Sequence, residues 1–270
     1  MSETPPSPFV PRRVAAGRAV QWLIGGAALF RRAPREWVML VIAVFLIMKI
    51  TLAIHLFLGL IAILLAPNFM AGLAHGCQGL ERGQPLRVGY LASGFLKSAG
   101  ALVTIGGIAL LGQLLSWVVI VMVGGDEMKA LAELGPKAFA DPANAEQVRA
   151  LTPQIASAFL AGTLVSLPFL LATWSAPMLV FFDNLKALPA MLLSLWACLR
   201  SIGAFLLLGA IVIAGLVLLM PLGLLTGQLD LGLWLLGPLL APAVYVSYKD
   251  LFPPAAPTTN ELPANVDERQ

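Results

Sequence analysis

The residues best suited to chemistry cluster in one short stretch, where His75, Cys77 and Glu81 are three potential metal ligands. On an α-helix successive side chains are rotated by about 100°, so His75 and Cys77 point about 200° apart, whereas Cys77 and Glu81 share a face. A structural zinc ion takes four ligands. This spacing argues against a metal site, and we expect neither a metal nor another cofactor.

Two further ionisable residues, Lys49 and Asp183, lie in or beside apolar sequence. Ionisable residues inside a membrane are functional candidates. Lys49, however, falls near the outer end of its expected helix, where its long stem can carry the ammonium group to the interface. Asp183 follows two phenylalanines and has Lys186 three residues on. We favour a surface ion pair or helix cap for Asp183, with a proton or substrate site as the alternative.

Prolines interrupt several apolar runs, and three of them follow an alanine: Pro67, Pro177 and Pro242. A proline removes a backbone donor and frees a carbonyl. Corresponding breaks in repeated helices can indicate a transporter site. Transporter cores usually carry polar residues near the midplane, and these runs contain very few. We therefore favour packing kinks over a transport route.

Catalytic signatures are missing from the sequence. It contains no phosphate-binding G-x-x-x-x-G-K-[ST], no H-E-x-x-H and no G-x-S-x-G. The two cysteines, Cys77 and Cys198, form no C-x-x-C motif and suit small buried residues. We expect a protein without enzymatic activity.

The composition determines the class of protein. Hydrophobic residues make up 59% of the 270 positions and charged residues only 11%, against about 25% in soluble domains. So few charges cannot cover a globule of this size, and lipid must solvate much of the surface. The sequence predicts an all-α, polytopic helical membrane protein.

Six spans account for the apolar runs, since each holds at least about 18 residues. The first run, between Trp37 and Leu80, is long enough to fold back, and the polar residues Lys49, Thr51 and His55 are the expected turn. A single span followed by a soluble segment is the alternative, but it would place Arg82 and Arg87 outside. The expected helices are 36–54, 56–80, 98–123, 155–181, 202–224 and 231–249, arranged as three hairpins.

The flanking segments complete the domain organisation. Residues 1–11 and 251–270 have the composition of disordered tails, around a membrane domain at 12–250. Residues 12–32 predict an amphipathic interfacial helix. Beside a membrane span, an arginine cluster indicates anionic headgroups rather than nucleic acid. The expected headgroup contacts are Arg12, Arg13, Arg18, Arg31, Arg32 and Arg35.

Loop charges predict the orientation. Basic residues fill the segments assigned to the cytoplasm, whereas the longest loop, 124–154, holds five acidic and three basic residues and suits the outside. Both chain ends are then cytoplasmic. No cleavable signal peptide is evident at the start of the sequence, so we expect the first span to direct insertion into a bacterial inner membrane.

An internal repeat is suggested by the three Ala-Pro pairs and by two similar junctions, Leu96–Ala101 and Leu199–Ala204. Chance matches among small residues are an equally good explanation. In its second copy the unit contains Ala176-Pro177, Asp183, Pro189 and Leu193–Arg200. This pattern resembles an uncharacterised group of bacterial multi-pass proteins related to the membrane domain of some glycerophosphoryl diester phosphodiesterases. The resemblance implies a six-helix inner-membrane domain and no catalytic residues.

The sequence thus favours a non-enzymatic inner-membrane protein that acts through lipid or membrane-protein contacts. A small transporter or channel that uses the proline-broken helices is the main alternative. A role as an assembly partner for other membrane complexes is a third possibility, with the partner unidentified.

Overall fold

The computed structural model describes residues 10–135, 142–228 and 230–253, and every regular element in these ranges is a helix. The tails predicted to be disordered lie almost wholly outside the described residues. The helices are α1 (Arg18–Arg32), α2 (Pro34–Ile54), α3 (Leu56–Leu64), α4 (Ala66–Glu81), α5 (Gly89–Leu96), α6 (Ala99–Glu133), η1 (Pro142–Asn144), α7 (Ala145–Trp174), α8 (Ala176–Asp183), α9 (Ala187–Arg200), α10 (Ile202–Thr226) and α11 (Leu231–Leu251).

Six stretches are long and apolar enough to cross a membrane, as predicted. They are α2, α3 with α4, α6, α7 with α8, α10 and α11. The first turn lies at His55, where the backbone is extended and the imidazole Nδ1 accepts the Phe57 N–H at 3.1 Å. Lys49 and Thr51 stay inside α2. The chain is a multi-pass helical membrane protein.

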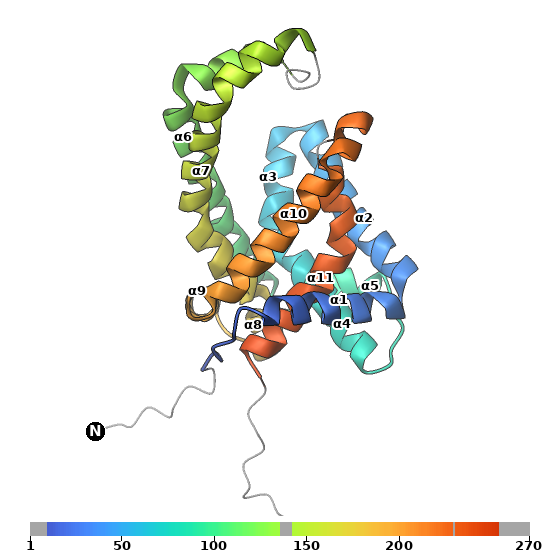
Figure 1. The fold of residues 1–270 in the computed structure, drawn as a ribbon. Coiled ribbons are helices and arrows are strands. Elements are labelled where there is room, and N and C mark those ends of the chain that lie inside the picture. Colours follow the sequence, from blue (N-terminus) through green and yellow to red (C-terminus); the bar gives the residue numbers. More distant parts are fainter. Residues whose placement is uncertain (1–9, 136–141, 229, 254–270) are drawn as a thin grey trace, which may run out of the picture.

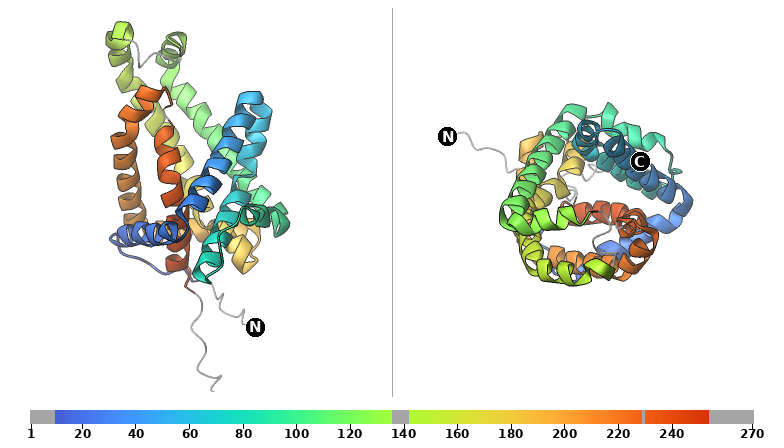
Figure 2. Two further views of the ribbon diagram at one scale, coloured as in Figure 1. Left: turned by 90° about the vertical axis from the view of Figure 1, so that its right-hand side faces the viewer. Right: turned by 90° about the horizontal axis from the view of Figure 1, so that it is seen from above.

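The two ends of the molecule differ in form (Figure 1). At one end, which we call the basal end, α1 lies across the molecule and packs against α11, α10 and α4. Helices α5, α8 and α9 lie at the same end, and both described chain ends emerge there. The Arg12 N–H donates to the Leu251 carbonyl at 2.8 Å, which joins these two chain ends. At the opposite, distal end the long helices rise and separate, with the α6–α7 pair reaching furthest (Figure 2).

The helices follow one another in the same order three times: a short basal helix, a span away from the base and a span back. The short helices are α1, α5 and α9. Each returning span packs beside a short helix: α4 against α5, α8 against α9, and α11 against α1. Because α1 starts the chain and α11 ends it, the last contact closes the base.

Two returning spans are broken at the predicted prolines. The first break lies at Leu65, before Ala66 and Pro67, and the second at Ser175, before Ala176 and Pro177. Proline is accepted in the first turn of a new helix because its missing N–H would have no partner there. Helix α11, in contrast, continues through the third proline, Pro242.

The expected 124–154 loop is largely helical. Helix α6 continues to Glu133 and α7 begins at Ala145, with a kink at Gly125 whose φ of 52° favours glycine. Close packing holds the pair together below this kink, where the Ser116 hydroxyl donates to the Gly162 carbonyl at 2.8 Å. The interfacial helix also differs from the prediction, because it starts at Arg18 rather than at residue 12.

Candidate functional site

The polar side chains of the basal end centre on the last turns of α11. Four residues there, Tyr245, Tyr248, Lys249 and Asp250, bond to partners on three other helices. We call these four residues and their partners Arg18, Trp22, Glu81 and Asp183 the basal network. Three of its members are carboxylates that lie near the ends of the three returning spans.

Glu81 ends α4 and joins it to α11. Its carboxylate accepts the Tyr245 hydroxyl at 2.9 Å and the Lys249 ammonium at 2.8 Å. The Lys249 ammonium also lies 5.5 Å from the centre of the Tyr245 ring, within the range of a cation–π contact. Both partners of the ion pair are about a third or more exposed, so solvent screens the pair.

Asp183 ends α8 and joins that helix to α11. Its carboxylate accepts the Tyr248 hydroxyl at 2.6 Å, and the Tyr248 ring stacks on Phe182 with centroids 5.9 Å apart. The Lys97 ammonium lies 5.0 Å from the centre of the neighbouring Phe181 ring. The expected pair with Lys186 is replaced by a hydrogen bond to a tyrosine that is distant in sequence.

Asp250 joins α11 to α1. Its carboxylate accepts two bonds from Arg18, at 2.7 Å from Nε and 2.6 Å from Nη2, and one from the Trp22 indole at 2.9 Å. The hydrogen bond to Asp250 raises the pKa of Arg18. A two-point guanidinium–carboxylate bond of this kind fixes orientation as well as distance. Arg18, expected to contact headgroups, is thus paired within the protein.

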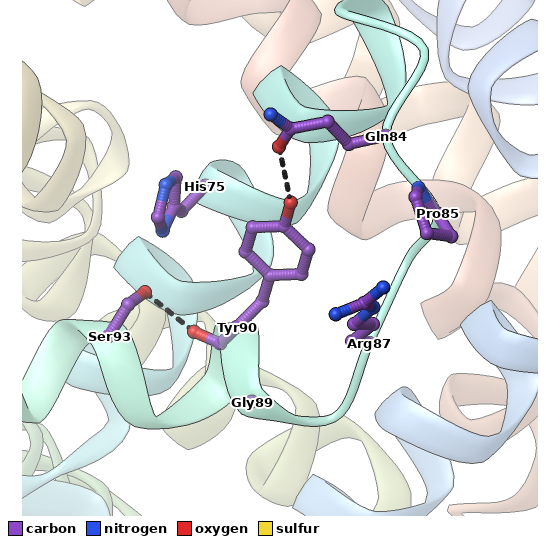
Figure 3. Close-up of a pocket in the computed structure, with 7 residues that line it drawn as sticks. All are labelled: His75, Gln84, Pro85, Arg87, Gly89, Tyr90 and Ser93. Carbon is purple, nitrogen blue, oxygen red and sulfur yellow. Dashed lines mark hydrogen bonds between the residues drawn. The ribbon is translucent and has the colours of Figure 1, made fainter.

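His75 lies apart from the basal network, in a pocket of about 540 Å³ between α4 and α5 (Figure 3). Its ring makes an edge contact with Tyr90 at 4.9 Å, and its buried Nδ1 has no hydrogen-bond partner. The Tyr90 hydroxyl donates to the side-chain oxygen of Gln84 at 2.9 Å. Cys77 is instead fully buried in the protein core, and no described group of three His, Cys, Asp or Glu could hold a metal.

Lys49 lies toward the distal end of α2, away from the basal network and from His75. Its ammonium pairs with Asp230 at 2.8 Å and lies 5.4 Å from the centre of the Trp234 ring. Burial disfavours the charged form of Asp230, but the hydrogen bonds from Lys49 and Trp234 outweigh that effect and lower its pKa. Lys49 therefore has a partner on the α10–α11 connection that the sequence analysis did not identify.

Buried polar groups mark both proline breaks. At the second break the Ser194 hydroxyl accepts the Ser175 N–H of the break at 3.0 Å and donates to the Leu171 carbonyl of α7 at 2.8 Å. At the first break the Asn68 amide donates to the Gly94 carbonyl at 3.1 Å. The Asn68 Oδ1 and the Ser175 hydroxyl are buried without a partner among the described residues.

The remaining arginines near the start of the chain lie at the surface. Arg12, Arg13, Arg31 and Arg35 are exposed. Arg32 is exposed as well, but its guanidinium donates to the Leu80 carbonyl at 3.1 Å. These side chains are more exposed than that of Arg18, which is paired with Asp250.

The sequence analysis identified Asp183 but missed the tyrosines that organise the network. Tyr245 and Tyr248 are three residues apart, which places them on one face of α11. Tyrosines near the end of an apolar helix are typical of a membrane interface. That signal indicates depth in the membrane, but it does not identify the carboxylates that the hydroxyls bind.

Comparison with known proteins gives no relative for this chain. No protein-family model, no curated protein and no solved structure matches it.

Proposed function

We propose that the chain is a non-enzymatic protein of the bacterial inner membrane that acts through contacts with anionic lipid headgroups at its basal end. The observation that carries this proposal is that the basal carboxylates are paired within the protein and most basal arginines are not. Glu81, Asp183 and Asp250 are bonded within the basal network, whereas the exposed arginines around it have no carboxylate partner among the described residues. The outward charge of this face is therefore basic.

The proposal places the basal end in the cytoplasm. Arg82, Arg87, Lys97, Lys186 and Arg200 lie in the segments that connect the basal helices, as a cytoplasmic face requires. The distal arms of α6 and α7 carry Asp126, Glu127, Glu133 and Glu146 against Lys129 and Arg149. Asp141 and Lys137, also part of the predicted acidic loop, lie outside the described residues.

We also propose that the three-unit order of helices is an internal repeat. Its support is that each returning span carries an Ala-Pro pair followed by a carboxylate of the basal network. A relation to the uncharacterised multi-pass group with a phosphodiesterase-type membrane domain remains part of this proposal. We further propose that α1 is an amphipathic helix at the membrane interface. One face of α1, which includes Trp22 and Leu29, packs on the protein, while Val20 and Ile24 are exposed.

Native nanodiscs test the lipid proposal. The protein is extracted from the membrane with its surrounding lipid by a styrene–maleic acid copolymer, and the headgroups are quantified by mass spectrometry. We expect anionic lipids to be enriched over the bulk membrane, and the double variant Arg31→Gln/Arg35→Gln to reduce the enrichment. A nanodisc with the bulk composition would contradict the proposal.

A small transporter is the second candidate, and one observation favours it. The unpartnered Asn68 Oδ1 and Ser175 hydroxyl lie at the two matched helix breaks, where transporters often bind ions. If ions pass these groups, proteoliposomes should show cation flux above protein-free vesicles, and Asn68→Leu should remove it. Flux no higher than the background would exclude this candidate.

A further inference from the structure

An apolar groove of about 670 Å³ opens between α7 and α10, and α11 forms its floor. Helix α7 lines it from Thr163 to Trp174, and α10 lines it from Ile202 to Ile213. The two helices diverge from their basal ends, where Trp174 meets Phe205 edge-on at 5.4 Å (Figure 1). None of the described residues that line the groove is charged. It is therefore suited to hydrocarbon along its whole length.

The length of the groove matches one leaflet of a bilayer. The distance along α10 from Ile202 to Ile213 is about 16 Å at 1.5 Å per residue. Half of a hydrocarbon core is about 15 Å thick. The groove is thus about as long as the part of an acyl chain that spans one leaflet.

A second, basic pocket of about 400 Å³ adjoins the basal mouth of the groove. Ile202 lines both, so the two spaces are neighbours at the start of α10. The basic pocket is formed where the segment Arg13–Ala16 packs on the start of α10. The Val14 N–H donates to the buried Ser201 hydroxyl at 3.1 Å, which fixes this segment against α10.

The charges of the basic pocket come from Arg13 and Arg200. Both side chains are exposed, and none of the described carboxylates pairs with either. The Arg200 guanidinium lies over the Trp196 ring, 4.8 Å from its centre, which leaves its edge free to donate. Two guanidinium groups at the mouth of an apolar groove match a phosphodiester linked to an acyl chain.

We propose that the groove and the basic pocket together bind one anionic phospholipid of the basal leaflet. Its phosphate lies between Arg13 and Arg200, and one acyl chain lies between α7 and α10. This inference rests on the proposed function, which it narrows from a basic surface to a single site. A bilayer lipid fits better than a protein segment because the charge is confined to the mouth and the groove has the depth of a leaflet.

Fluorescence quenching by brominated lipids tests the site, because Trp174 lines the groove. The full chain and its Trp174→Phe variant are reconstituted in phosphatidylcholine vesicles that contain a minor fraction of phosphatidylglycerol or phosphatidylcholine brominated on the acyl chain. The difference between the two proteins isolates the Trp174 signal. We expect phosphatidylglycerol to quench it with a preference of roughly thirtyfold, the order expected for two basic residues at a membrane surface.

Matched variants separate the headgroup from the groove. Arg13→Gln/Arg200→Gln should abolish the preference, whereas Arg31→Gln/Arg35→Gln should retain it. Gly209→Phe should suppress quenching by either lipid, because a Cβ at Gly209 meets nothing within 4 Å and the added ring fills the groove. Gly100→Phe, at an equally open position outside the groove, should leave the quenching unchanged.

Three results would overturn the site. Equal quenching by both lipids would show a groove filled by bulk acyl chains, and a preference that survives Arg13→Gln/Arg200→Gln would place the headgroup elsewhere. No quenching by either lipid would show that protein, such as a second copy of the chain, covers the groove. If the nanodiscs show anionic enrichment while any of these results is obtained, the site fails and the proposed function stands.

Discussion

The basal and distal ends of this protein are stabilised in different ways. At the basal end, large side chains such as Trp22, Trp37 and Leu179 are fully buried between helices. At the distal end, residues of the same apolar character face outward, and Leu218 and Leu225 of α10 are 80% and 84% exposed. In a bilayer, lipid tails solvate such side chains as well as another helix does. The base is thus held by protein contacts, and the distal half relies on the membrane.

The polar contacts show the same difference. Asp250 at the base is only 6% exposed and has three bonds from Arg18 and Trp22, whereas both side chains of the distal Lys49–Asp230 pair are about a third or more exposed. Removing a donor from a buried carboxylate leaves a costly unsatisfied charge. When one partner of an exposed ion pair is removed, water solvates the remaining charge at little cost. Removal of an ion-pair partner should therefore lower the free energy of unfolding more at the basal end than at the distal end.

The largest loss of stability is expected where α6 touches the end of α3 through a glycine. A Cβ at Gly106 of α6 would collide with the Leu64 carbonyl at the first break, whereas a Cβ at Gly100 meets nothing within 4 Å. Gly106→Leu should lower the free energy of unfolding by about 3 kcal/mol or more, and Gly100→Leu should be tolerated. Thermal melting of the two variants in the same detergent measures the difference. Equal melting temperatures would show that the break is not closely packed.

The ion pair between α1 and α11 should have the next largest effect. Arg18→Gln removes the two-point bond to Asp250, and we expect a loss of about 2 kcal/mol. Lys49→Gln is the matched distal substitution and should cost about 0–1 kcal/mol. Melting temperatures of the two single variants compare them, and a larger loss at Lys49 would reverse the proposed difference between the ends.

Tyr248 should give a smaller loss. Tyr248→Phe keeps the ring stacked on Phe182 but removes the hydroxyl from the half-buried Asp183, for which we expect a cost of about 1–2 kcal/mol. If that bond is the cause, Tyr248→Phe should cost little in an Asp183→Asn background. A double-mutant cycle of melting temperatures tests this, and additive losses would mean that the hydroxyl acts through another group.

The distal pair also predicts a pH dependence. Because the pKa of Asp230 is lowered in the folded protein, its contribution is present above the unfolded value of about 3.9 and is lost as the pH falls through the folded value. The small difference in the free energy of unfolding between the native chain and the Lys49→Gln variant should therefore be constant from pH 7 to pH 5 and vanish in stronger acid. A difference that disappeared near neutral pH would point to another titrating group.

The smallest expected effect concerns the two native thiols. Cys77 and Cys198 are both fully buried, and burial raises the pKa of Cys198 to about 12. A thiolate is needed for reaction with maleimide, so neither should be labelled at pH 7 in the folded protein. Labelling after denaturation is the control. Rapid labelling of the native protein would mean that the base opens.

Local sequence signals predicted the spans well, because length and apolarity alone decide what can cross a bilayer. The breaks at Pro67 and Pro177 followed from the missing N–H of proline. At Pro242 the helix α11 is not interrupted, and the kink expected there stays a prediction. The helical arms beyond Gly125 were missed because their polar composition suited a loop equally well.

The basal network could not be predicted because its partners are distant in sequence. Asp183 and Tyr248 are 65 positions apart, and Arg18 and Asp250 are 232 apart. Only the packing of α11 beside α1 and α4, and its side-chain contacts with the end of α8, bring these groups together. Without that packing, Arg18 could not be distinguished from the neighbouring arginines that face outward, and Lys49 had no visible partner.

Single-cysteine labelling in intact cells tests the central claim, that the basal end faces the cytoplasm and the distal end the outside. Cysteines are introduced at Gln84 and Lys186 on the base and at Ala145 and Gln228 on the distal side, all of which are exposed. A membrane-impermeant maleimide should label only Ala145→Cys and Gln228→Cys until the cells are lysed. Labelling of Gln84→Cys or Lys186→Cys in intact cells would contradict the orientation, and with it the proposal that the basal arginines meet the cytoplasmic leaflet.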